Sequence, residues 1–143
     1  MGVSESFHDV VENYHLAAAE FVKGNPEPYN ALWSHAEDVT VGNPWGPPMR
    51  GWESVKPTME RAADLWRDGE VVGFENISTI VTSELGFIVE IERFNAKMGG
   101  SDQLTPVALR TTSILRPEQG TWKIIHRHAD SITTARGAES LSH

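Results

Sequence analysis

The interpretation of this chain depends on one segment, Trp122-Lys123-Ile124-Ile125-His126-Arg127-His128-Ala129-Asp130. In a β-strand, successive side chains point to opposite faces of the sheet. Strict alternation therefore places a half-apolar, half-titratable set on one face: Trp122, Ile124, His126, His128 and Asp130. A face of this composition suits the wall of a ligand pocket better than a dry core or open solvent. We expect His126 and His128 to face an enclosed pocket.

This segment is the last of four strand-like segments joined by short polar turns, which we place at residues 71–82, 86–98, 104–116 and 122–133. Earlier in the chain, apolar residues recur at helical spacing. We expect helices over residues 4–23, with Ser4 as the N-cap, over 28–34, and over 51–68, where Gly69 ends the third; a brief strand covers 38–43. Helices followed by an antiparallel meander predict an α+β fold, with three N-terminal helices packed on a curved, mostly antiparallel sheet. We expect a single domain over residues 1–133 and a polar tail over 134–143.

Composition excludes several classes of protein. The chain has 143 residues, a formal net charge of −8 and no cysteine, so disulfides, thiolate catalysis and cysteine-ligated metals are ruled out. The acidic balance argues against a nucleic-acid-binding surface. The N-terminus lacks the basic and apolar regions of a secretory signal, and no window approaches about 18 apolar residues. We therefore expect a cytoplasmic protein that binds neither nucleic acid nor membrane.

Several local patterns, in this order, resemble the nuclear-transport-factor-2-like (NTF2-like) superfamily, and within it the SnoaL-like and ketosteroid-isomerase-like proteins. They are Val10-Val11-Glu12-Asn13-Tyr14, Asp38-Val39-Thr40-Val41-Gly42-Asn43-Pro44, Arg50-Gly51-Trp52-Glu53-Ser54-Val55, Arg110-Thr111-Thr112, and the run from Gly120 to His128. The resemblance implies a cone-shaped half-barrel, in which three helices close a strongly bent sheet around a cavity. It also implies that the protein is a homodimer, because such proteins often pair through the outer face of the sheet.

The same resemblance argues against steroid isomerisation. Ketosteroid isomerase has a general-base aspartate just before the proline of the first strand's motif, where this chain has Asn43. An amide cannot accept a proton at neutral pH. Tyr14 matches the oxyanion-donating tyrosine, but the region around Arg110 lacks the second donor, a protonated aspartic acid. We expect no ketosteroid isomerase activity.

His126 and His128 are the main candidates for acid/base catalysis, because imidazole titrates near neutrality. Arg110 and Thr112 alternate on a face that looks into the cavity of the resembling proteins. Arg110 is therefore a candidate for holding a carboxylate or enolate oxygen, with Tyr14 as a second donor.

Glu90 and Glu92 share one face of the strand over residues 86–98, and alternation cannot say whether that face is inward. If inward, they would lie opposite Arg110 as catalytic candidates or ion-pair partners. One of them would also be the third ligand if His126 and His128 held a metal ion. Two inward carboxylates cost desolvation, so we expect at least one to face solvent. We expect the histidines to line a polar pocket without metal.

The remaining candidates would contact a ligand rather than react with it. Trp45 lies in a Pro/Gly-rich loop that reaches the cavity mouth in the resembling fold. It would either close over a flat apolar ligand or anchor the loop on the core. The ligand-binding candidates are Trp45, Asn43, Trp33, Thr112 and Asp130.

Together these observations favour a protein that binds a small organic molecule in a closed apolar pocket, without a cofactor. If it is an enzyme, we expect a lyase or isomerase that uses histidine acid/base chemistry. The alternative is a noncatalytic ligand-binding or dimerisation module.

Overall fold

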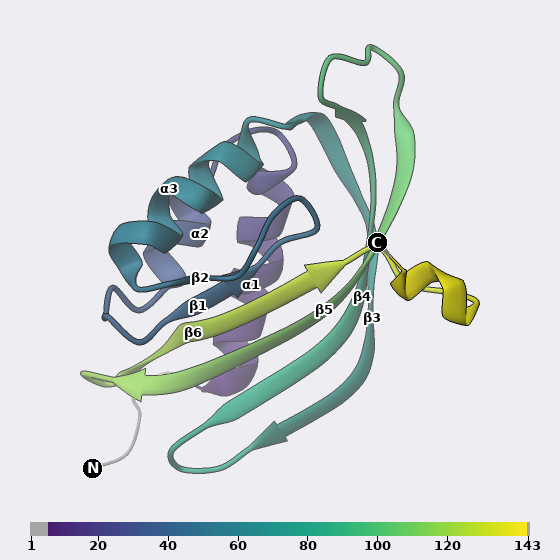
Figure 1. Cartoon of the computed structure of the whole chain (residues 1–143). Helices are drawn as coiled ribbons and strands as arrows, with labels where there is room; N and C mark the ends of the chain where they lie inside the picture. Colours follow the sequence, from purple (N-terminus) through teal and green to yellow (C-terminus); the bar gives the residue numbers. More distant parts are fainter. Residues whose placement is uncertain (1–5, 143) are drawn as a thin grey trace.

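The computed structural model describes residues 6–142 and has the predicted α+β architecture (Figure 1). Three helices, α1 (Phe7–Phe21), α2 (Glu27–Leu32) and α3 (Trp52–Ala63), pack on one side of a six-stranded sheet. A short 3-10 helix follows the last strand at Ala138–Leu141. The strands are β1 (Thr40–Gly42), β2 (Met49–Arg50), β3 (Trp66–Val81), β4 (Gly86–Met98), β5 (Thr105–Glu118) and β6 (Thr121–Asp130).

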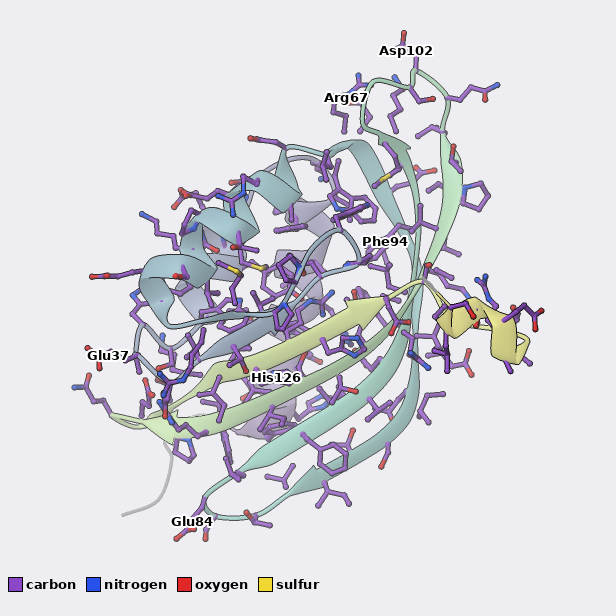
Figure 2. All side chains as sticks on the ribbon, viewed as in Figure 1. Glu37, Arg67, Glu84, Phe94, Asp102 and His126 are labelled. Carbon is purple, nitrogen blue, oxygen red and sulfur yellow. The ribbon has the colours of Figure 1, made fainter. Side chains whose placement is uncertain are left out.

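The sheet has the strand order β2-β1-β6-β5-β4-β3. β1 runs parallel to β6, and every other pair is antiparallel. The four long strands bend around α1, so sheet and helices together form a cone (Figure 1). The turns at the two ends of the meander carry Glu84, between β3 and β4, and Asp102, between β4 and β5 (Figure 2).

Helix α1 supplies one wall of the cone. Ser6 is its N-cap and accepts a hydrogen bond from the backbone N–H of Asp9, which satisfies one of the free donors of the first turn. The predicted cap Ser4 lies outside the described residues. The predicted spacing holds, because the buried face consists of Phe7, Val10, Tyr14, Ala17, Ala18 and Phe21.

Among residues 6–142, no helix has the length and apolar character that a bilayer crossing requires.

The prediction for residues 64–70 is wrong. Helix α3 ends at Ala63, and Trp66 begins strand β3, where it pairs with Met98. Gly69 does not stop a helix; it allows β3 to pass close to α1. A Cβ on Gly69 would lie 2.3 Å from the carbonyl oxygen of Val22, a distance that real side chains do not tolerate. The apolar spacing of Trp66 reflects burial against the helices rather than a further helical turn.

Candidate functional site

A β-bulge in β6 decides which side chains enter the cone. Ile114 of β5 pairs with His126, whereas Leu115 pairs with Ile124, so Ile125 is an extra residue on β6. The extra residue shifts the alternation by one position. Trp122 and Ile124 point inward before the bulge, and Arg127 and Ala129 point inward after it. The predicted orientation of His126 and His128 toward an enclosed pocket is therefore wrong.

The inward residue Arg127 forms a buried network in the centre of the cone. Its Nη1 and Nη2 atoms donate to the two carboxylate oxygens of Glu92 at 3.0 and 2.9 Å, and Nη1 also donates to the Tyr14 hydroxyl. The Tyr14 hydroxyl lies 2.7 Å from the Ser113 hydroxyl. The guanidinium carbon is 5.4 Å from the centre of the Tyr29 ring, within the range of a cation–π interaction. Each charge in this network thus has a partner of opposite sign or a hydrogen-bond partner.

This environment changes how the network ionises. Burial raises the pKa of Tyr14 above its usual range, although the charge on Arg127 opposes the shift, so the hydroxyl stays protonated. Burial on its own lowers the pKa of Arg127, but the Glu92 carboxylate raises it well above the usual value. Arg127 therefore remains a cation, and the network presents an ion pair and a neutral phenol.

The outward residues form a second polar group on the opposite face of the sheet. Arg110 donates two hydrogen bonds to Asp130 Oδ2 and one to Oδ1, and His128 Nε2 lies 3.2 Å from Asp130 Oδ2. Thr112 lies opposite His128 in the β5–β6 register. The predicted site residues thus divide between two faces, because Tyr14 lies inside the cone. Arg110 does not look into the cavity.

Two of the outward groups titrate away from their usual values. His126 is half-buried and its Nδ1 lies 2.7 Å from the Thr40 hydroxyl. Partial burial and the neighbouring His128 lower the pKa of His126. For Asp130, burial acts to raise the pKa, but the hydrogen bonds from Arg110 and the Ile132 backbone lower it below the ordinary value.

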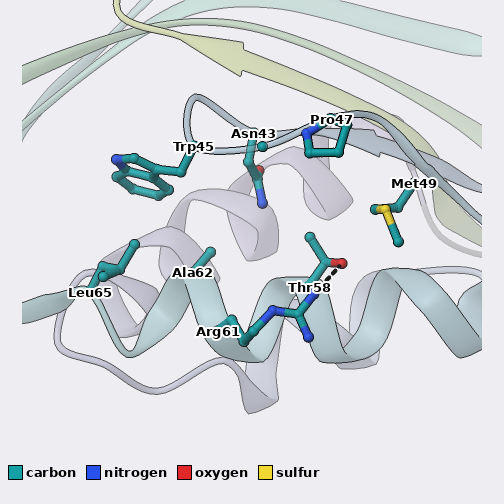
Figure 3. Close-up of a pocket in the computed structure, with 9 residues that line it drawn as sticks. Asn43, Trp45, Pro47, Met49, Thr58, Arg61, Ala62 and Leu65 are labelled. Atoms are coloured by element: carbon teal, nitrogen blue, oxygen red, sulfur yellow. Dashed lines mark hydrogen bonds between the residues drawn. The ribbon is translucent and has the colours of Figure 1, made fainter.

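A cleft opens at the mouth of the cone between the loop 43–48 and helix α3 (Figure 3). We call it the mouth cleft; its volume is about 390 Å³. Asn43, Trp45 and Pro47 line it from the loop, Ala62 lines it from α3, and Leu65 lines it from the turn that follows α3. Its remaining lining residues are Gly46, Met49, Thr58 and Arg61. Trp45 is 49% exposed, so it forms a wall of the cleft and is not buried in the core.

A smaller space lies next to the mouth cleft, inside the cone, and shares lining residues with it. This inner space has a volume of about 30 Å³ and is lined by Asn43, Trp45 and Ala62, which it shares with the mouth cleft, and by Glu92 and Arg127. Phe94, which is labelled in Figure 2, also lines this space. The volume corresponds to roughly one or two water molecules. The interior of the cone therefore admits a polar atom of a ligand, whereas the body of a ligand must lie in the mouth cleft.

Trp66 and Trp33 differ in their placement relative to the inner space. Trp66 lines the inner space, and its buried indole N–H has no hydrogen-bond partner among the described residues. Trp33, a predicted ligand contact, is buried in the core beside Trp52 and lines neither the mouth cleft nor the inner space. Trp66 therefore contributes to the wall of the inner space, whereas Trp33 contributes to neither space.

Glu90 and Glu92 both point inward, so the expectation that one of them faces solvent is wrong. The desolvation cost is offset locally, because Glu92 pairs with Arg127 and Glu90 with His15. The histidine pair and the two glutamates lie on opposite faces of the sheet and cannot share one ion. Among residues 6–142, no three His, Asp or Glu side chains are placed to hold a metal.

Sequence reasoning did not select Arg127, Ser113 or the pairing of His15. Arg127 follows a β-bulge that the amino-acid composition does not predict. One signal was available: two glutamates on one strand face need cations nearby if that face is buried.

Comparison with known proteins places this architecture in a family. A family model of the SnoaL-like domain matches residues 8–134, so the chain belongs to the SnoaL-like family. A search of curated proteins found no match.

Solved structures agree with this fold. An NTF2-like superfamily protein from Salmonella enterica is 14% identical, with a TM-score of 0.74, over 92% of this chain and 94% of that one. A ketosteroid isomerase-like protein from Erwinia carotovora is 13% identical, with a TM-score of 0.73, over 92% and 99%. A proposed dehydratase of the NTF2-like family from Streptomyces avermitilis is 17% identical, with a TM-score of 0.68, over 90% and 100%. At these identities the likeness shows the fold alone.

Proposed function

We propose that this SnoaL-like protein binds a small, mostly apolar organic molecule in the mouth cleft. The observation that carries the proposal is that the mouth cleft shares the lining residues Asn43, Trp45 and Ala62 with the inner space, which is also lined by Glu92 and Arg127. A volume of about 390 Å³ lies within the range of small-molecule sites, which are mainly apolar with a few polar groups. The apolar body of the ligand packs against Trp45 and Leu65, and an acceptor atom reaches toward Trp66 and Arg127.

Binding without catalysis is supported best by the ionisable groups near the ligand. Arg61 is the ionisable residue among those that line the mouth cleft, and a guanidinium is not deprotonated at neutral pH, so it cannot act as a general base. In the inner space, Glu92 and Arg127 neutralise each other. No histidine lines either space in the described part of the chain. The cleft therefore offers recognition groups rather than a free general acid or base.

Proton transfer beside a ligand carbonyl, as in a lyase or isomerase, is a second candidate. It is favoured by one observation: the Glu92 carboxylate reaches the inner space and lies 3.3 Å from the protonated Tyr14 hydroxyl. Glu92 would accept the proton, and Tyr14 or Arg127 would donate to the developing oxyanion. Exchange of a ligand C–H for deuterium in D₂O, followed by NMR, tests this reaction. Exchange that persists in Glu92→Gln would exclude Glu92 as the base.

The binding proposal is tested with 8-anilinonaphthalene-1-sulfonate, an aromatic fluorescent probe that carries one anionic group. We expect Trp45→Ala to weaken probe binding by about tenfold, because the indole forms one wall of the cleft. Leu104→Ala is the control, since Leu104 is similarly exposed, at 53%, and lies outside both spaces. Equal affinities for the two variants would contradict the proposal. Native mass spectrometry of the purified protein then identifies any ligand that is retained by wild type and lost from Trp45→Ala.

We also infer that two copies pair through the outer face of the sheet. Apolar side chains gather on this face next to His126 and His128: Ile80, Phe87, Val89, Ile91 and Ile114. A contiguous apolar area on a sheet face is typical of an interface. Sedimentation velocity should show a dimer that Phe87→Glu converts to a monomer. Leu141→Glu, on the exposed 3-10 helix, should leave the dimer intact; a monomeric wild type would refute the inference.

A further inference from the structure

His15 and Glu90 form a second hydrogen-bonded pair, which lines neither the mouth cleft nor the inner space. His15 Nε2 lies 2.8 and 3.1 Å from the two carboxylate oxygens of Glu90. The His15 ring stacks on Phe74, with ring centres 3.8 Å apart and planes inclined by 6°. The carboxylate and the aromatic ring together fix the position and rotation of the imidazole.

The hydrogen bond also fixes the form of the neutral imidazole. An ionised carboxylate can only accept, so Nε2 must carry the hydrogen. In the neutral ring, Nδ1 then presents its lone pair, and no hydrogen bond joins Nδ1 to another described residue. A carboxylate that fixes one nitrogen so that the other is free to act is a recurring arrangement at functional sites.

The carboxylate of Glu90 is costly to bury. Its side chain is 3% exposed, and His15, at 26%, is its one hydrogen-bond partner among the described side chains. When His15 is in its neutral form, the pair carries the net negative charge of the Glu90 carboxylate. This charge favours the approach of a cation from the side that His15 leaves open.

That side is a groove along the first half of α1, which we call the α1 groove. It has a volume of about 440 Å³. Its apolar residues include Phe7, Val11, Phe74 and Ile88. Its ionisable lining groups are Glu90, His15 and His8, with no lysine or arginine among the described lining residues. The α1 groove shares no lining residue with the mouth cleft or the inner space.

We propose that the α1 groove is a second binding site, selective for a small organic amine with an apolar body. The ammonium group donates a hydrogen bond to His15 Nδ1 and lies in the negative potential of Glu90. The apolar body covers Phe7, Val11 and Ile88. A carboxylate ligand of the same shape is disfavoured. It would be repelled by the Glu90 charge, and it has no hydrogen to donate to the lone pair of His15 Nδ1.

The test compares 2-phenylethylamine with phenylacetate, two probes with the same ring and opposite charge. NMR titration of the wild-type protein, with the side-chain nitrogens of histidine as reporters, measures both affinities. We expect the amine to bind about tenfold more tightly than phenylacetate. We also expect the Nδ1 resonance of His15 to move with the amine alone.

Glu90→Gln keeps the size of the side chain and removes its charge, so the preference for the amine should fall to within about threefold. Glu20→Gln is the matched control, because Glu20 is a partly exposed carboxylate on the same helix that pairs with Lys23 and lies outside the α1 groove, and it should preserve the preference. Trp45→Ala should leave amine binding unchanged, which separates this site from the mouth cleft. Equal binding of both probes to wild type, or an unmoved Nδ1 resonance, overturns the proposal even if Glu90→Gln does not fold.

Discussion

The substitution Arg127→Met tests whether the centre of the cone is held by a charge pair. Arg127 and Glu92 are 7% and 1% exposed as side chains and are joined by two hydrogen bonds of 2.9 and 3.0 Å. Methionine preserves much of the apolar length of arginine and removes the cation. The Glu92 carboxylate would then remain buried with Tyr14 as its hydrogen-bond donor.

The expected loss is large because the charge left behind has no water to replace its partner. Breaking a buried ion pair by removing one member costs about 3–5 kcal/mol. For a domain of this size, 1 kcal/mol corresponds to about 3 °C in melting temperature, so the midpoint should fall by about 10–15 °C. The double variant Arg127→Met/Glu92→Leu buries no charge, and its stability should lie within about 2 kcal/mol of wild type.

Urea unfolding followed by tryptophan fluorescence measures these free energies, since the chain has five tryptophans. Arg110→Met is the control, because Arg110 forms an exposed ion pair with Asp130. Surface ion pairs contribute about 0–1 kcal/mol. The reasoning fails if the double variant is as unstable as the sum of the two single variants. It also fails if Arg127→Met costs no more than Arg110→Met.

Three further predictions concern the bulge, a close approach and a titrating group. Deletion of Ile125 should give one-to-one pairing of β6 with β5 while Arg127 still points inward, at a cost of about 1–2 kcal/mol in unfolding free energy for the lost apolar burial. Deletion of Thr112, in the regular part of β5, should instead exchange the inward and outward side chains of part of that strand and abolish cooperative unfolding. Gly69→Ala should cost about 1–3 kcal/mol in urea unfolding, because its Cβ would overlap Val22, whereas Gly73→Ala, with open space around it, should cost far less. The folded pKa of His126 is lowered, so its contribution to stability is present above the unfolded value of about 6.5 and lost as pH falls through the lower folded value. Unfolding free energies measured across this pH range should therefore vary less in His126→Gln than in wild type, and an unchanged pH dependence would contradict the assignment.

The sequence predicts the elements of this fold well where the spacing of apolar residues and the flanking turn residues indicate the same element. Residues 86–98 were predicted as a strand and form β4, because Gly86 and Gly99 bound a run of alternating burial. The error at Trp66 arose because its position fits both the helical spacing and the strand spacing of apolar residues. Its position continues the helical spacing of α3, but pairing with Met98 extends β3 instead. Local spacing cannot report a pairing partner that lies 32 residues along the chain.

The candidate site was harder to predict than the fold, because one extra residue reverses the faces of a strand. Up to Ile124, the edge of β6 that faces away from β5 contacts the segment that follows α2. Trp33 forms a bridge with Ile124, and the Ser34 N–H donates to the Ile124 carbonyl oxygen. From His126 onward the same edge pairs with β1 at Thr40. The bulge at Ile125 lies at this change of neighbour, so its cause is tertiary.

Charge balance still gave a route to the correct answer. If Glu90 and Glu92 both face inward, a buried face with two carboxylates requires at least one cation within reach. With strict alternation in β6, the inward face would hold His126 and His128 and would leave Arg127 in solvent. With one bulge, it holds Arg127, which stays charged at any pH where the protein is folded and can bond both oxygens of Glu92 at once. Energetics therefore favours the bulged register even though periodicity does not, and the same one-residue shift places His126 and His128 on the outer face.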